Sequence, residues 1–414
     1  MEVSGDNERL YDMNNTNEKL PHDLVMEILS WLPIKHLSPL RCVSKTWRKL
    51  LTKDTQFAKL QYDRFLEINN NYPDPMILGL VCRNENDSDL MLATEFISCD
   101  KALSVQLPFY QPTNSYYLCG IHNGLLCVSR LDKKEVYIWN PLIDDHIIIS
   151  CLPAPAIRFP GYCKSTGFGL PAPAIRFPGY CKSTGFGFGF DQDSNVYKVA
   201  RFFCERNCDH FGKILDSWTQ ISVYTLGVDS MWRTVEVDID RMCNLTDDIM
   251  PLVNGALHWH TDRPGSISYD LIVAFDLKEE VISEFLLPHG IEFQDIVELG
   301  GFLCATDRPG NSEVHIWVMK EYGVVSSWSK QYVIGKPEGD MYFCHLSTLR
   351  FTHNGEIILR KLSGDLVRYN PETNTVMDLK RSRFAVFLPY AYLGSIISPT
   401  AISRSDHHLL EEES

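Results

Sequence analysis

Two short patterns recur through most of this 414-residue chain. The first is a turn followed by an apolar stretch: NGLLCV from Asn123, NGALHW from Asn254, GGFLC from Gly300 and NGEIIL from Asn354. Asn-Gly supplies the positive φ angles that tight hairpin turns require. The second is an alternating strand that ends in an aromatic residue; these residues are Trp139, Tyr224, Phe275, Trp317 and Tyr369. Together the patterns predict a repeated β structure.

The spacing of these aromatic residues indicates the size of the repeat. Successive steps are 85, 51, 42 and 52 residues. A period of about 40–50 residues with several strands in each unit is typical of β-propeller blades. We therefore expect an all-β, propeller-like (kelch-like) domain over residues 73–402.

An unchanged 18-residue duplication accounts for part of the long first step. Residues 152–169 read LPAPAIRFPGYCKSTGFG, and residues 170–187 repeat them. Two identical segments cannot fill different places in one packed blade, so we expect one copy to run into the strand around Phe188. The other is expected to be a surplus loop, because exposed insertions cost little stability. We assign the duplication no function.

Residues 18–62 have helical rather than strand-like spacing. Pro21 suits the first turn of a helix and Pro33 ends that helix, and two further short helices follow. The chain is thus predicted to be an α+β multidomain protein with a three-helix unit at its start. The apolar residues of the three helices are Leu24, Val25, Ile28, Leu29 and Leu32, then Leu37 and Leu40, then Val43, Trp47, Leu50 and Leu51.

A unit of this size rarely buries enough surface to fold alone without disulfides, a metal or a partner. The apolar stripe is also too wide for one small core, so we expect part of it to dock on another protein. Eight basic and four acidic residues give the unit a charge of +4, whereas the rest of the chain carries −18, which favours an acidic partner for the helices. The alternative is a helical cap that packs on the β domain.

The remaining segments are a polar tail over residues 1–17, predicted to be disordered, a linker over residues 63–72 and a charged tail over residues 403–414. The start has neither the basic residues nor the apolar stretch of a signal peptide, and no apolar run reaches the ~18 residues of a membrane span. We therefore expect a cytoplasmic or nuclear protein without a membrane partner. A net charge of −14 argues against nucleic-acid binding, and thirteen cysteines without paired CxxC spacing argue against a disulfide framework.

Few residues indicate chemistry. Cys204, Cys208 and His210 offer zinc ligands, but no fourth ligand is evident, so we predict no metal site. A GxGxxA pattern at residues 167–172 has Pro171 where a nucleotide-binding helix should begin, and the alternating glycines up to 189 suit strand packing. The sequence His258-Trp259-His260 is typical of a strand in a core. With no catalytic motif present, we predict neither catalytic residues nor a cofactor.

The span from Leu20 to Trp47 closely resembles the F-box, through its leading Leu-Pro, the Ile28-Leu29 pair, Leu32-Pro33 and RCVSKTWR from Arg41. In that family the F-box binds Skp1, which links it to the cullin and RING subunits of an SCF ubiquitin ligase. The resemblance implies a set of core and Skp1-facing positions, two roles that the sequence does not separate. They are Leu20, Pro21, Leu24, Ile28, Leu29, Leu32, Pro33, Leu37, Val43 and Trp47.

The β region resembles the F-box-associated domain of plant F-box proteins. The matching motifs are NGLLCV, IWNP, GFGFD, VYKVAR, VNGALHW, IVAFDL and IWVMKEYGVVSSW, the last of which (residues 316–328) is similar to the S-locus F-box proteins of self-incompatible plants. The duplicated segment departs from the family pattern and leaves the geometry between Asp145 and Phe190 open.

These resemblances imply a non-catalytic substrate-recognition subunit of an SCF ligase, whose β domain captures a protein for ubiquitination and proteasomal degradation. The S-locus resemblance implies style ribonucleases as prey, met in the pollen tube during self-incompatibility. A paralogue that regulates defence receptors is the rival within the family. Outside it, a propeller enzyme or sugar-binding lectin with an N-terminal helical cap is the alternative. Substrate contacts are expected on loops at one propeller face, with no individual residues assigned.

Overall fold

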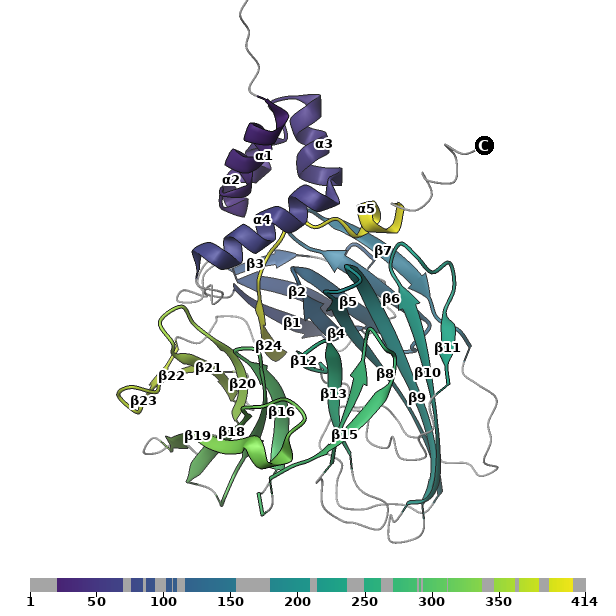
Figure 1. Ribbon diagram of the computed structural model, residues 1–414, viewed down its shortest axis with the longest axis vertical. Helices are drawn as coiled ribbons and strands as arrows, with labels where there is room; N and C mark the ends of the chain where they lie inside the picture. The colour runs from purple at the N-terminus through teal and green to yellow at the C-terminus, as the bar shows by residue number, and fades with distance from the viewer. Residues whose placement is uncertain are drawn as a thin grey trace, which may run out of the picture.

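In the computed structural model of the chain, the described residues are 21–69, 76–84, 87–93, 102–105, 107–109, 116–153, 179–208, 214–236, 249–261, 271–288, 290–291, 293–310, 312–336, 346–361, 365–379 and 387–404. Within them, a group of helices precedes a domain of β-sheets (Figure 1). The predicted tail over residues 1–17 lies outside this set.

Four helices form the first part: α1 (His22–Ser30), α2 (Ile34–Leu40), α3 (Lys45–Lys53) and α4 (Thr55–Ile68). The two prolines stand at the helix starts, Pro21 as the N-cap of α1 and Pro33 as that of α2. The side chains of Ser44 and Asp54 accept hydrogen bonds from the backbone N–H three residues on, which caps α3 and α4.

The prediction of three helices and of a linker from residue 63 was wrong about α4. This helix continues to Ile68, six residues past the predicted boundary at 62. Phe57, Ala58, Gln61 and Tyr62 are buried, at the spacing of one helical face. The helix forms because that face has a surface to pack on, and Asp54 provides its start.

The described strands form six four-stranded antiparallel sheets. In sheet order these are β24 (Phe387–Tyr392), β1 (Met76–Asn84), β2 (Asp87–Ala93) and β3 (Ala102–Val105); β4 (Tyr116–His122), β5 (Leu125–Arg130), β6 (Glu135–Asn140) and β7 (Asp145–Ser150); β11 (Arg233–Val235), β10 (Ile214–Thr225), β9 (Val196–Cys208) and β8 (Gly179–Asp191); β12 (Leu252–Val253), β13 (Ala256–Thr261), β14 (Leu271–Asp276) and β15 (Ile282–Leu286); β16 (Phe293–Leu299), β17 (Phe302–Asp307), β18 (Glu313–Met319) and β19 (Trp328–Gly335); β20 (Leu346–Phe351), β21 (Ile357–Lys361), β22 (Leu366–Asn370) and β23 (Thr375–Asp378).

The sheets are arranged as the blades of a propeller. The first strands of neighbouring blades contact one another, for example β4 with β8, β16 with β20 and β20 with β24, so these strands are innermost. A short 3₁₀ helix (Val325–Ser327) and a final helix α5 (Pro399–Arg404) complete the described elements. The predicted fold class, helices followed by a propeller-like all-β domain, is confirmed.

Each recurring sequence pattern has one place in a blade. The four turns that begin at Asn123, Asn254, Gly300 and Asn354 all join a first strand to a second. Asn123 and Gly124 have φ angles of 47° and 76°, the left-handed region for which this dipeptide was expected. The five aromatic residues all lie on third strands, namely β6, β10, β14, β18 and β22.

The sequence repeat missed one blade because its strands come from the two ends of the domain. The last strand, β24, pairs with β1 and becomes the innermost strand of the first blade. Tyr392 is fully buried, and its hydroxyl donates a hydrogen bond to the carbonyl oxygen of Gly124, 3.0 Å away. This pairing closes the ring of blades.

The second copy of the duplication enters the fold as predicted. Its last nine residues, from Gly179 to Gly187, begin strand β8, which continues to Asp191. A Cβ atom on Gly187 would lie 2.5 Å from a methyl carbon of Leu257 in the next blade, so a glycine there allows close strand packing. Residues 154–178, with most of the first copy, lie outside the described residues, and the surplus loop stays a prediction.

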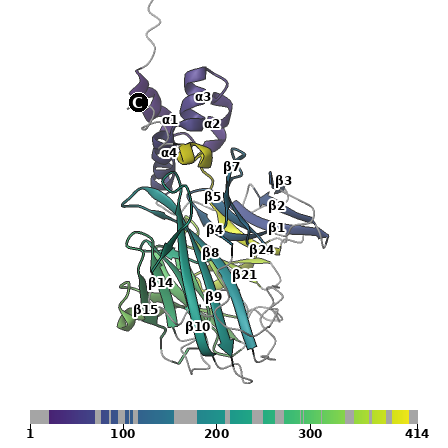
Figure 2. The ribbon, with the colours of Figure 1, turned by 90° about the vertical axis from the view of Figure 1, so that its right-hand side faces the viewer.

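Helices and blades share one hydrophobic core. Leu29 and Leu51 from the helices belong to the same buried cluster as Phe188 on β8 and Ile396 in the segment before α5. Figures 1 and 2 show α4 lying across one face of the propeller, with α1, α2 and α3 beyond it. The helical unit is therefore seated on its own β domain.

Candidate functional site

Three large apolar side chains of the helical unit are more than half exposed. Leu24 and Ile28 lie one helical turn apart on α1, and their exposed fractions are 51% and 53%. Val43, in the turn between α2 and α3, is 60% exposed. Pro21 and Pro33 are exposed as well. We call Leu24, Ile28 and Val43 the exposed apolar group.

Other apolar side chains of the same helices are buried. Leu29 is 3% exposed and Leu37 is 1% exposed, and both belong to the core shared with the propeller. Leu32 and Trp47 are partly buried and pack against that core. The structure thus divides the residues singled out in the sequence into an outward and an inward set.

Leu20 and Val43 also belong to the residues singled out in the sequence. Leu20 lies outside the described residues. Val43 was placed on the third helix, which was wrong: α3 begins at Lys45, after its N-cap Ser44. The Ser44 hydroxyl accepts a hydrogen bond from the N–H of Trp47, so the helix starts two residues after Val43 and leaves that side chain in a turn.

Sequence reasoning missed Trp31, which joins α1 to α4. Its indole N–H donates to Glu27 at 3.0 Å, and the guanidinium of Arg64 lies 4.0 Å from the ring centroid. Arg64 also pairs with Glu27 at 3.1 Å. Trp31 follows Ile28 by three residues and Leu24 by seven, so helical spacing could have revealed it.

Helix α4 connects the helical unit to the propeller. Phe57 is fully buried in the shared core. The ammonium of Lys59 donates to the side-chain oxygen of Asn195, in the β8–β9 turn, at 2.6 Å and lies 5.4 Å from the Phe190 ring centroid. On the helical side, the Gln61 amide donates to the carbonyl oxygen of Leu32 at 3.1 Å. The helical unit is therefore packed on the β domain on one side and exposed on the other.

The other motif residues belong to the body of the propeller. His258 is fully buried on β13, and its Nε2 atom lies 2.9 Å from the hydroxyl of Tyr322; burial lowers the pKa of His258 to about 4. Trp259 is buried in the core between this blade and the neighbouring one, where its ring lies 4.9 Å from that of Phe202. Cys204 is a buried cysteine on β9, whereas His210 lies outside the described residues. Within the described part of the chain, no three His, Cys, Asp or Glu side chains are grouped as metal ligands would be.

The described helices are all too short or too polar to cross a membrane.

Comparison with known protein families matches both parts of the chain. Residues 18–58 match the F-box domain, and residues 81–386 match the F-box associated beta propeller domain. In Arabidopsis thaliana, F-box protein At3g07870 is 27% identical over 402 residues, which cover 87% of each chain. F-box protein CPR1 from the same plant is 26% identical over 381 residues, covering 87% of this chain and 84% of that protein.

Among solved structures, a virginiamycin B lyase from Staphylococcus aureus with quinupristin matches 75% of this chain and 87% of its own, at 11% identity and a TM-score of 0.37. The family match rests instead on the propeller model, which spans most of the chain, and on the F-box ahead of it. This chain therefore belongs to the plant F-box proteins that carry an F-box-associated β-propeller domain.

Proposed function

We propose that the protein is the substrate-recognition subunit of an SCF ubiquitin ligase and that the exposed apolar group docks on a Skp1-like protein. The observation that carries this proposal is the exposure of Leu24, Ile28 and Val43, each more than half open to solvent. Several large apolar side chains left exposed on one small unit are typical of a protein-binding site. The charge of +4 on residues 18–62 adds attraction to an acidic partner.

The remaining F-box residues are proposed to support this surface from behind. Leu29 and Leu37 fill the core, so their loss would act through folding rather than through contact. Leu32 and Trp47 are partly buried and pack against that core. Leu20, Pro21 and Pro33 complete the set that the family resemblance assigns to Skp1 binding and the F-box core.

The shared core gives the proposed adaptor a mechanism based on position. A protein held by the propeller stays at a fixed distance from Skp1, because α4 packs on both parts through Phe57 and Gln61. Holding substrate lysines near a ubiquitin-loaded enzyme raises their effective concentration. The transfer chemistry then resides in the partner subunits, and this chain supplies no nucleophile.

The prey is proposed to bind the propeller face opposite α4, since α4 lies over part of the other face (Figure 1). The charge of −18 on the chain outside residues 18–62 favours a basic prey, and style ribonucleases are the candidate that the S-locus resemblance suggests. Intracellular immune receptors are the rival candidate. Expression restricted to pollen supports the first, whereas expression throughout leaves supports the second.

Affinity purification from plant cells, with and without a proteasome inhibitor, tests this proposal. The full chain should recover a Skp1-like protein and a cullin, together with a prey that accumulates when the proteasome is blocked. Ile28→Asp should lose Skp1 and cullin but keep the prey, because the prey binds the propeller. Ile68→Asp is the matched control, since Ile68 is 56% exposed and lies beyond the F-box match. A chain that never recovers Skp1 would instead support the enzyme or lectin alternative.

A further inference from the structure

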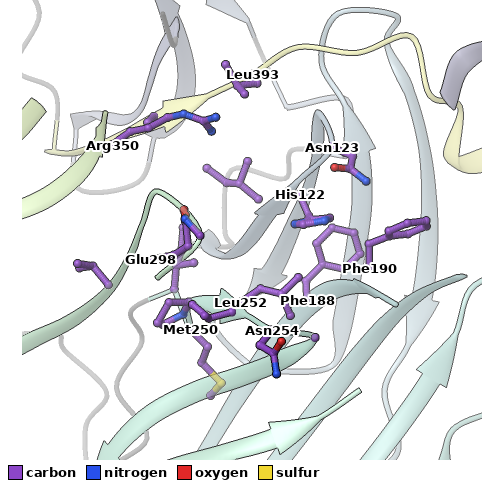
Figure 3. Close-up of a pocket in the computed structure, with 18 of the residues that line it drawn as sticks. His122, Asn123, Phe188, Phe190, Met250, Leu252, Asn254, Glu298, Arg350 and Leu393 are labelled. Atoms are coloured by element: carbon purple, nitrogen blue, oxygen red, sulfur yellow. The ribbon is translucent and has the colours of Figure 1, made fainter. Parts of the chain in front are cut away.

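The charged side chains of the cavity at the propeller centre already have partners within the chain. The cavity has a volume of about 770 Å³, and Figure 3 shows part of its lining. Glu298 accepts a hydrogen bond from the N–H of Gly301 at 2.6 Å, and Lys278 pairs with Asp193 at 2.8 Å. The other charged residues of the lining, which have partners as well, are Asp191, Asp276, Asp295, Arg350 and Arg360. Every charged side chain in the cavity therefore has a partner without a ligand.

Two turns between outer strands of the propeller instead expose apolar side chains. Val228 and Met231 lie in the turn between β10 and β11, and their exposed fractions are 63% and 71%. They are the two most exposed large apolar side chains in the described part of the chain. Val281, which is 52% exposed, lies in the turn between β14 and β15 of the next blade. We call Val228, Met231 and Val281 the turn group.

Ion pairs hold these two turns side by side. The guanidinium of Arg233, at the start of β11, pairs with Glu280 in the β14–β15 turn and lies 3.5 Å from the carboxylate of Asp229 in the β10–β11 turn. Glu280 also accepts a hydrogen bond from the buried ammonium of Lys198 at 2.9 Å. Asp229 accepts one from the N–H of Thr225 at 2.7 Å. The turn group therefore lies on a surface that is formed before any partner binds.

The surroundings of the turn group are acidic. Residues 226–236 and 277–286 together carry five acidic and two basic side chains, a net charge of −3. Lys198 and Asp193, which pair with side chains of these segments, cancel each other. Arg404 of α5 adds one positive charge, because that helix lies against the β10–β11 turn. The region thus has a net charge of −2, which favours a cationic partner.

Helix α3 and the turn before it have the complementary properties. Val43, two residues before α3, is 60% exposed. The four basic side chains of α3 are exposed, and none of them pairs with an acidic side chain among the described residues. They are spaced three or four residues apart, so their like charges repel one another. We call Val43 and these four side chains the α3 surface, which comprises Val43, Lys45, Arg48, Lys49 and Lys53.

We propose that the α3 surface of one copy of this chain docks on the turn group of a second copy. Both surfaces are exposed in a single chain, so they do not contact each other within it. In the contact, Val43 covers the apolar side chains of the turn group, and the cations of α3 face nearby carboxylates such as Glu279 and Glu284. Two different surfaces meet, so the interface is heterologous and further copies can add at both ends.

This contact does not depend on the proposed function. Val43 also belongs to the exposed apolar group, for which Skp1 is the proposed partner. If that proposal holds, Skp1 and a second copy compete for Val43, and the chain associates with itself only where Skp1 is scarce.

Sedimentation velocity of the full chain over roughly 1–100 µM tests the proposal, because contacts of this small size are weak. The average mass of the natural chain should rise with concentration beyond that of two chains. Val43→Asp, which places a carboxylate opposite the acidic turns, should remain a single chain. The double variant Val228→Asn with Met231→Asn, which removes two apolar side chains of the turn group, should also remain a single chain.

Mixing the two variants identifies the heterologous contact. Each variant keeps the surface that the other lacks, so an equimolar mixture should form a complex of two chains and nothing larger. That complex also shows that both variants are folded. Met377→Asn is the matched control, since Met377 is 57% exposed on β23, in another blade, and this variant should associate like the natural chain. Salt at about 0.5 M should weaken the association, because opposite charges contribute to it.

Four results would overturn the proposal. The natural chain could stay a single chain at every concentration, or salt could leave its association unchanged. Either variant could associate on its own, which would mean that one surface pairs with itself. The mixture could form no complex of two chains, or Met377→Asn could lose association as completely as the turn variant.

Discussion

Ile28 and Leu29 are neighbours on α1, yet 53% of Ile28 is exposed and only 3% of Leu29. The surface of α1 therefore changes from exposed to buried between these two residues. Leu29 faces the core that the helices share with the propeller, and Ile28 faces solvent. The two residues look alike in the sequence but have different proposed roles, which makes them a sensitive pair for mutation.

Replacing each of the two residues should separate stability from binding. Leu29→Ala is expected to lower the free energy of unfolding by about 2–5 kcal/mol, because it removes a buried side chain and leaves a cavity. Ile28→Asp should change it by no more than about 0.5 kcal/mol, as an exposed substitution. Urea denaturation followed by circular dichroism measures both. Equal losses in the two variants would contradict the assigned orientation of α1.

The shared core predicts that helices and propeller unfold together. Phe57 is fully buried between them, so Phe57→Ala should cost about 3–5 kcal/mol and lower the melting temperature of the whole molecule. Differential scanning calorimetry should show one transition for the natural chain and one transition, at lower temperature, for the variant. A separate transition for the helices, with an unchanged melting temperature for the propeller, would contradict the shared core.

Close packing of the inner strands can be tested at Gly120 on β4. A Cβ atom there would lie 2.7 Å from the Cβ atom of Phe188 on β8, too close for an ordinary contact. Gly120→Ala should therefore destabilise the protein by about 1–3 kcal/mol. Gly335→Ala is the control, because a Cβ atom on Gly335 meets nothing within 4 Å. Thermal melts that rank the two variants equally would argue against this blade spacing.

Buried histidines predict a loss of stability in mild acid. Burial lowers the pKa of His258 to about 4, whereas an unfolded histidine titrates near 6.5. Between these values the unfolded chain takes up a proton that the folded chain does not, so stability falls as the pH drops from 6.5 toward 4. The contribution of His258 is on the order of 3 kcal/mol at full loss.

Urea titrations at pH 7 and pH 5 measure this effect. The natural chain should be less stable at pH 5, and His258→Gln should show a smaller difference between the two pH values, although it is less stable at both. A pH dependence that His258→Gln leaves unchanged would assign the effect to other groups.

Much of the propeller could be predicted from sequence because its signals are local. Asn-Gly turns and aromatic third strands depend on neighbouring residues only, and each fell in its expected kind of element. The closing blade could not be found this way, because β24 and β1 are nearly the whole domain apart in sequence. Patterns of neighbouring residues cannot predict a pairing between strands so far apart in the sequence.

The residues of the candidate site were named from the sequence, but the sequence did not show which of them are exposed and which are buried. Leu24 and Leu29 are both leucines on one helix, and which of them faces the propeller depends on a domain that follows in the chain. The expectation that part of the apolar stripe docks on another protein stays a prediction. Part of the stripe packs on the chain's own blades through α4, and only the remainder is exposed.

The dissociation constant for a purified Skp1-like protein tests the central claim most directly. Isothermal titration should give the same affinity for the natural chain and for Ile68→Asp, in which an equally exposed isoleucine outside the F-box match is changed. Ile28→Asp and Val43→Asp should bind roughly 100-fold more weakly, since each would bury an unpaired charge in the interface. Undiminished binding by both of these variants would show that Skp1 does not dock on the exposed apolar group.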